Sequence, residues 1–211
     1  MDRSQRRSPQ RRSSKPHGRE EVKTALLSAA NDLFGRRGPD AVSVRDVAAL
    51  AKVNHALVHR HFGTKEKLLQ LVMEDHAAAF RDAVHSCPDA AAAAEVLSKM
   101  RVERPAFVKI VAHLILSGRP AREFARHDGG IAALASKSVA EREDGGRNAK
   151  LDVISAVALI LGVGFFAPFL VEAANYEGDQ ESVSDHALKI VGQLLGRPTR
   201  HRPRGRTRRA P

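Results

Sequence analysis

Apolar positions between residues 20 and 37 recur at three- and four-residue spacing, which predicts an amphipathic helix over this stretch. Acidic residues begin the stretch and arginines close it, an arrangement that the helix dipole favours. Gly38-Pro39 then ends the helix. The apolar face consists of Val22, Ala25, Leu26, Ala29, Leu33 and Phe34.

Two short helices are predicted next. Ser43 begins the first, with Asp46 at the spacing of a capping box, and Asn54 caps the second, which runs to about residue 60. Thr64 caps a longer helix that follows. Two helices this short cannot form a core of their own. Their spacing is typical of a helix-turn-helix, which places one helix in a groove of DNA.

The remainder of the chain predicts about five further helices, separated by glycine and proline. No segment shows a sustained two-residue alternation of apolar and polar residues, and alanine and leucine are abundant. We therefore expect an all-α fold. We divide it into a basic arm at 1–19, a helix-turn-helix domain at 20–64, a larger helical domain at 65–196 and a basic tail at 197–211.

Charge is distributed unevenly along the chain. The net charge is +11, while residues 1–19 and 197–211 together carry +13, so the rest carries −2. Both ends are poor in apolar residues, and we expect them to be disordered. Two interpretations stay open: the arginines attract phosphates without regard to sequence, or they only keep the protein in solution. The first leads to an alternative function, a non-specific nucleic-acid-binding protein that acts through its tails.

Composition argues against several other classes of protein. Cys87 is the only cysteine, which excludes a disulfide within the chain and suits a reducing cytoplasm. The basic N-terminal residues have no apolar stretch behind them, so they do not form a signal peptide. We find no nucleophile–base pair and no phosphate-binding loop, and Gly162-Val-Gly164 lacks a third glycine. We expect a cytoplasmic protein that is not an enzyme and uses no cofactor or metal.

The region from Val22 to Leu69 resembles the DNA-binding domain of the TetR family of bacterial transcriptional regulators. The resemblance covers about a quarter of the chain. Three positions depart from the family pattern: Lys52 stands where a turn glycine is common, Leu57 replaces a small hydroxyl residue, and His59 replaces a tyrosine. The matching residues are Ala29-Ala30, Leu33-Phe34, Gly38, Val42-Ser43-Val44, Val47-Ala48, Ala51, Val53, His61-Phe62, Lys65-Glu66 and Leu68-Leu69.

This comparison and the exposed donors together indicate which residues contact DNA. The starts of the second and fourth helices offer free backbone amides that can hold phosphates, and the third helix presents an exposed face to the bases. His55, His59 and His61 could instead bind a metal, since His55 and His59 stand one turn apart, but no carboxylate or cysteine nearby completes the set, and we expect His61 to pack inward. The expected DNA contacts are Ser43, Arg45, Lys52, Asn54, His55, Ala56, His59, Arg60, Thr64 and Lys65.

Residues 153–171 form an uncharged stretch that just reaches the length needed to cross a membrane. The stretch also holds Ser155, two glycines and Pro168, and no second apolar span accompanies it. We therefore expect it to be buried at a subunit interface and around an internal pocket. The resemblance implies the same, since the last two helices of the family, here about 147–176 and 180–196, form a dimeric four-helix bundle.

The resemblance also implies an effector site. Aromatic and apolar residues could line it, with His113 or Glu172 as a polar anchor, although each residue taken singly is better explained as ordinary core. The implied function is a homodimeric repressor that binds a palindrome in double-stranded DNA and is released by a small hydrophobic effector. Activation stays open. The expected apolar lining is Phe107, Leu114, Phe165, Phe166 and Phe169.

Overall fold

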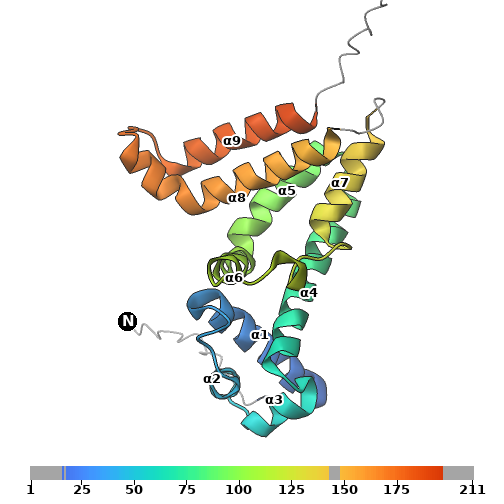
Figure 1. Cartoon of the computed structure of the whole chain (residues 1–211), viewed down its shortest axis with the longest axis vertical. Helices are drawn as coiled ribbons and strands as arrows, with labels where there is room; N and C mark the ends of the chain where they lie inside the picture. The colour runs from blue at the N-terminus through green and yellow to red at the C-terminus, as the bar shows by residue number, and fades with distance from the viewer. Residues whose placement is uncertain (1–15, 17, 143–147, 197–211) are drawn as a thin grey trace, which may run out of the picture.

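The computed structural model describes residues 16, 18–142 and 148–196, and all regular structure within those ranges is helical. The all-α prediction is confirmed. The predicted arm and tail lie almost wholly outside the described residues. The elements, shown in Figure 1, are α1 (Arg19–Arg37), α2 (Val44–Leu50), α3 (His55–Phe62), α4 (Lys65–Ser86), α5 (Ala90–Glu103), α6 (Pro105–Leu116), the short 3₁₀ helix η1 (Ala121–Glu123), α7 (Gly130–Ala140), α8 (Ala149–Ala173) and α9 (Gln180–Leu195).

The helices pack around two apolar cores. The first lies among α1, α2, α3, the first half of α4 and α6. The second lies among the second half of α4, α5, α7, α8 and α9. Figure 1 shows α1–α3 at one end of the molecule and the antiparallel pair α8 and α9 at the other. We call the part of the molecule around the first core the head and the part around the second core the body.

Helix α4 joins the head to the body without a break. It contains 22 residues, begins at the Thr64 cap and ends where Cys87 precedes Pro88. Its first half contributes to the first core and its second half to the second, so the boundary that we predicted after residue 64 does not separate the cores. The buried residues of its first half are Leu68, Leu69, Val72 and Met73, and those of its second half are Phe80 and Val84.

Helix α6 belongs to the body in sequence but packs against the head. The ring of His113 lies so close to Gly38, at the end of α1, that a side-chain carbon there would be 2.9 Å from His113 Nδ1. Gly38 also has a φ of 78°, a conformation that favours glycine. Beyond α6, Arg119 donates to Asp40 over 2.8 Å and holds the pKa of that carboxyl below its ordinary value. The end of α1 is therefore fixed to α6 and to the segment after it.

Helix α8 covers the second core with one face only. Val153, Ala156 and Ile160 are buried on that face, while only 28% of the most apolar window of the helix is buried. This helix is long and apolar enough to cross a membrane. Core helices of soluble proteins can have the same length and composition. The large apolar side chains exposed on α8 are Leu151, Ile154, Phe165, Phe166, Phe169 and Leu170.

A buried histidine lies on α4 where the two cores meet. His76 Nε2 lies 2.7 Å from Asn31 Oδ1 on α1, and its ring stacks at a tilt on Phe107 of α6, with 5.3 Å between ring centroids. His76 Nδ1 is buried and has no hydrogen-bond partner among the described residues. Burial lowers the pKa of His76, and the charge of Arg104 acts in the same direction. His76 is thus held neutral between three helices.

We predict that the protein loses stability as the pH falls from about 7 to about 5, the range in which histidine changes charge. The unfolded chain takes up a proton there that folded His76 resists, so the free energy of unfolding falls by less than about 1.4 kcal/mol per pH unit, the limit for one proton. Urea denaturation at several pH values measures this slope. His76→Phe should flatten it. His85→Gln, at an exposed histidine of the same helix, should leave it unchanged, and an equal slope in both variants would contradict the assignment.

Candidate DNA interface

The start of α2 is closed by a capping box, as predicted. Ser43 Oγ accepts from the Asp46 backbone N–H over 3.1 Å, and Asp46 Oδ2 accepts from Ser43 N and from Ser43 Oγ, both over 2.8 Å. The donated backbone N–H, followed by the hydroxyl, lowers the pKa of Asp46. The Ser43 hydroxyl proton is therefore already used within the protein. The donors left for a phosphate at this end are the amides of the first helical turn, at Val44 and Arg45.

The turn between α2 and α3 includes the departure at Lys52. This residue adopts a φ of 58°, in the left-handed region where the family more often has glycine, so the side chain tolerates the geometry of the turn. Asn54 then caps α3, with its side-chain oxygen accepting from Ala56 N over 2.9 Å. The Asn54 oxygen is consequently occupied, which leaves its amide NH₂ as the exposed part.

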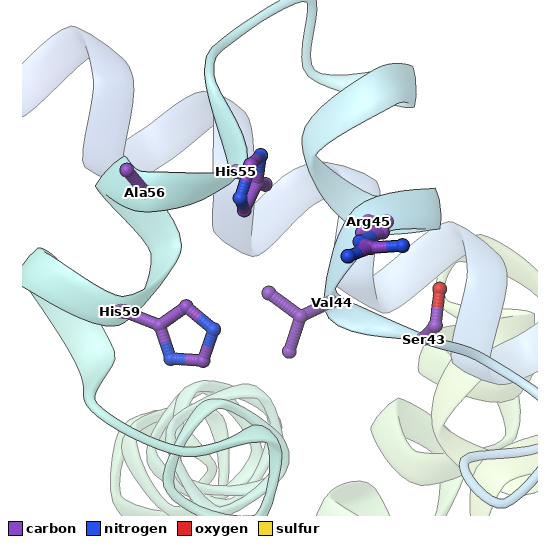
Figure 2. A pocket seen from close by; sticks show the side chains of 6 residues that line it. All are labelled: Ser43, Val44, Arg45, His55, Ala56 and His59. Carbon is purple, nitrogen blue, oxygen red and sulfur yellow. The ribbon is translucent and has the colours of Figure 1, made fainter.

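Helix α3 buries one face and exposes the other. Val58 and Phe62 lie in the first core, while His55, Ala56 and His59 line a groove of about 630 Å³. The opposite wall of this groove is the first turn of α2. Figure 2 shows Val44 and the His59 ring turned toward the same open space. The groove-lining residues are Ser43, Val44, Arg45, His55, Ala56 and His59.

The start of α4 uses its polar groups in two ways. Thr64 Oγ1 accepts from Lys67 N over 3.1 Å, which is the predicted cap. Lys65 Nζ donates to the carbonyl oxygens of Pro39 and Val42, over 2.9 and 3.1 Å. The half-buried ammonium of Lys65 thus ties the loop before α2 to α4, and the predicted phosphate contact of Lys65 stays a prediction for its backbone amide. Its backbone amide still lies in the first turn of α4.

The other predicted DNA residues are exposed at this end of the molecule. The structure brings five of the ten together around the groove, namely Ser43, Arg45, His55, Ala56 and His59. Sequence reasoning missed Gly63, whose carbonyl oxygen lies 2.9 Å from His59 Nδ1. The position of a glycine four residues after a histidine, at a helix end, is the signal that could have identified this contact. Within the described ranges, no three His, Cys, Asp or Glu side chains gather as a metal ion would require.

The predicted effector residues, in contrast, lie in different environments. Phe107 packs on His76, His113 lies against Gly38, and Leu114 is buried in the first core. Phe165, Phe166, Phe169 and Glu172 are exposed on α8. The shared effector site of these residues stays a prediction, because hydrophobic periodicity and composition do not reveal which face of a helix meets which neighbour. A second cavity, of about 370 Å³, lies among α4, α6 and residues 119–126, and Leu114 is its only lining residue from the predicted set.

Comparison with known proteins agrees with this arrangement. The family model described as bacterial regulatory proteins, tetR family, matches residues 26–72, which run from α1 into α4. The chain is also 38% identical, over 181 residues, to the HTH-type transcriptional repressor Rv3405c of Mycobacterium tuberculosis, and the match covers 83% of this chain and 92% of that protein. The chain belongs to the TetR family of bacterial transcriptional regulators.

Solved structures of TetR-like fold extend the likeness to the body. A TetR-like regulator from Rhodococcus sp. RHA1 superposes with a TM-score of 0.61 at 16% identity, over 85% of this chain and 98% of that one. A transcriptional regulator from Saccharomonospora viridis, solved in complex with choline, gives a TM-score of 0.60 at 17% identity, over 82% and 96%. At these identities the likeness shows a shared fold, which includes the helices after the TetR DNA-binding domain.

We predict that Lys65→Met loosens the loop before α2 in this TetR-family head. The change removes two charge-assisted hydrogen bonds to backbone carbonyls, so we expect the free energy of unfolding to fall by about 1–3 kcal/mol. Lys67→Met, at an exposed lysine in the same first turn of α4, is the matched control and should change the free energy of unfolding by less than about 0.5 kcal/mol. Chemical denaturation measures both. Equal losses in the two variants would show that the Lys65 contacts contribute little.

Proposed function

We propose that this TetR-family regulator is a homodimeric repressor that binds a palindromic operator through α3 and is released by a small hydrophobic effector. The observation that carries the DNA-binding part is the groove between α3 and the first turn of α2. It combines an exposed helix face of suitable size for the major groove with backbone amides suited to an adjacent phosphate. The related mycobacterial protein is named as a transcriptional repressor, which supports the sign of regulation.

In this proposal the contacts divide by chemistry. The amides at the starts of α2 and α4 hold phosphates, with the Arg45 guanidinium and the Thr64 hydroxyl beside them. Asn54, His55 and Ala56, at the start of α3, read base edges, as the N-terminal part of a recognition helix does. Lys52 and Arg60 add charge next to the DNA backbone.

Dimerisation is supported by the outer face of α8. Phe169 is 68% exposed in the single chain, and further large apolar side chains surround it. A contiguous apolar surface of this kind usually marks an interface, because its burial gains about 25 cal/mol per Å². Gly162 lies within the same helix, and an added side-chain carbon there would meet nothing within 4 Å. We propose that α8 and α9 of two subunits form a four-helix bundle, which would set the recognition helices one DNA turn apart.

The effector acts only through its different affinities for two shapes of the dimer. The cavity among α4, α6 and residues 119–126 is the candidate site, because its inner wall is formed by the apolar residues Leu69, Met73 and Leu114. Its volume falls within the range of small-molecule pockets. It also touches α4 near the head, so an occupant could change the position of the head. As a transcriptional regulator that binds bacterial DNA, the protein would act in the cytoplasm.

The decisive experiment for function is selection from random duplex DNA with the full chain, at about 0.15 M salt and with excess competitor DNA. We expect a palindrome whose half-sites lie about one helical turn apart. Binding without sequence enrichment would instead favour the non-specific function of the basic ends. The selected operator then serves to screen small apolar compounds for release. A dimer whose operator affinity no compound alters would contradict the effector switch but leave DNA binding intact.

We predict that Phe169→Asp and Gly162→Leu each separate the dimer into monomers. Burial of an unpaired carboxylate costs several kcal/mol, so the aspartate should weaken dimerisation at least about a hundredfold. The Cβ of the leucine meets nothing within 4 Å in its own chain, and its side chain would hold the two α8 helices apart. Size-exclusion chromatography with light scattering measures the mass. Leu116→Asp, at an apolar residue of α6 that is 85% exposed, is the control and should remain dimeric. Dissociation by Leu116→Asp alone would place the interface elsewhere.

A further inference from the structure

The imidazole of His59 has a fixed arrangement of its ring proton. His59 Nδ1 lies 2.9 Å from the carbonyl oxygen of Gly63. A carbonyl oxygen can only accept a hydrogen bond, so Nδ1 must be the nitrogen that carries the proton. In the neutral ring the other nitrogen, Nε2, then presents only a lone pair.

The backbone at the end of α3 explains why this carbonyl is available. Gly63 has φ 75° and ψ −70°, and Thr64 N donates to Phe62 O over 2.9 Å, which together define a classic γ-turn. Gly63 N also donates to His59 O over 2.9 Å. Gly63 is therefore connected to His59 twice, through the main chain and through the ring. A residue other than glycine would be strained at this φ.

The free nitrogen faces a place where an anion is expected. His59 is exposed and lines the groove opposite the first turn of α2, which supplies amides and Arg45. Phosphate oxygens, like carbonyl oxygens, only accept hydrogen bonds. A neutral His59 would set the Nε2 lone pair against the phosphate, whereas an imidazolium would donate to it from Nε2 and keep Nδ1 on Gly63.

We propose that His59 contacts a DNA phosphate only in its protonated form, so that each subunit takes up one proton when the protein binds DNA. This inference rests on the proposed function and adds to it a dependence on pH. A tyrosine hydroxyl, the usual family residue at this position, donates without any change of charge. The substitution therefore converts a constant contact into one that strengthens as the pH falls.

Several charged groups surround His59 and bear on its proton. Arg45, from α2, opposes a second positive charge in the free protein, and His55, from α3, lines the same groove. Arg60 is the next residue on α3, while Lys65, Glu66 and Lys67 begin α4 directly after the Gly63 turn. The C-terminal end of α3 favours a cation through its dipole. A phosphate between His59 and Arg45 reverses the repulsion between them, which is why proton uptake accompanies DNA binding.

The first test needs no DNA. Nitrogen-15 NMR of the histidine-labelled full chain reports which ring nitrogen carries the proton at high pH. We expect the proton of His59 on Nδ1, whereas a proton on Nε2 would overturn the proposal. Because this measurement is made on the free protein, its outcome is independent of whether a specific operator exists.

The second test measures affinity for duplex DNA, the selected operator or otherwise a random duplex, from about pH 8.5 to about pH 6 at constant ionic strength. We expect tighter binding at lower pH, approaching about tenfold per pH unit for each proton taken up. His59→Gln, whose amide donates without titrating, should bind with a flatter pH dependence. His85→Gln, at an exposed histidine of α4 outside the groove, is the matched control and should keep the wild-type slope.

Calorimetric titration in buffers of different ionisation enthalpy counts the protons directly. The proposal expects about one proton fewer per subunit for His59→Gln than for the wild type. It is overturned by an affinity that is independent of pH, by an unchanged proton count in His59→Gln, or by loss of the pH dependence in His85→Gln alone. If His59→Gln fails to fold, the position of the ring proton and the wild-type proton count still decide the matter.

Discussion

The continuity of α4 is the constraint on which the rest of this molecule depends. A single helix of 22 residues supplies apolar side chains to both cores, with His76 buried between them. The head cannot change its position relative to the body without bending this helix or moving its contacts with α1 and α6. Because core side chains pack at high density, such contacts change between discrete arrangements rather than gradually. The position of α3 relative to the body is consequently determined by how α4 is packed.

At the DNA-facing end, the fold and the ligand compete for the same polar groups. The hydroxyl of Ser43 closes the capping box, the ammonium of Lys65 binds two carbonyls, and Nδ1 of His59 binds Gly63. Each of these groups was a plausible phosphate donor in the sequence. Their internal use rigidifies two short helices that have little core of their own. What remains for DNA is the set of backbone amides, the guanidinium of Arg45 and the second nitrogen of His59.

The sequence predicted the helices of the head well, because their boundaries depend on local chemistry. Ser43, Asn54 and Thr64 cap helices where expected. For Lys52 the sequence left open whether the turn changes or the residue tolerates its geometry, and the structure shows the left-handed conformation. The effector residues are harder to predict, since they depend on which helix faces meet in three dimensions. Phe107 and the phenylalanines of α8 are the same residue type but lie in different environments. Phe107 packs against His76, whereas those of α8 are exposed. The His59 to Gly63 contact falls between these cases: its spacing is local, yet its direction depends on a γ-turn.

The contacts at the end of α1 indicate how a change in the body can reach α3. Gly38 meets His113, Asp40 is paired with Arg119, and the carbonyls of Pro39 and Val42 accept from Lys65 of α4. This short loop leads directly into the first turn of α2, which forms one wall of the groove, while α3 forms the other. The cavity among α4, α6 and residues 119–126 includes Arg119 in its lining. A molecule bound there and a phosphate bound in the groove would therefore act on the two ends of one loop. Because the loop is fixed on both sides by polar contacts, displacement of Arg119 would alter the angle at which α2 presents its amides.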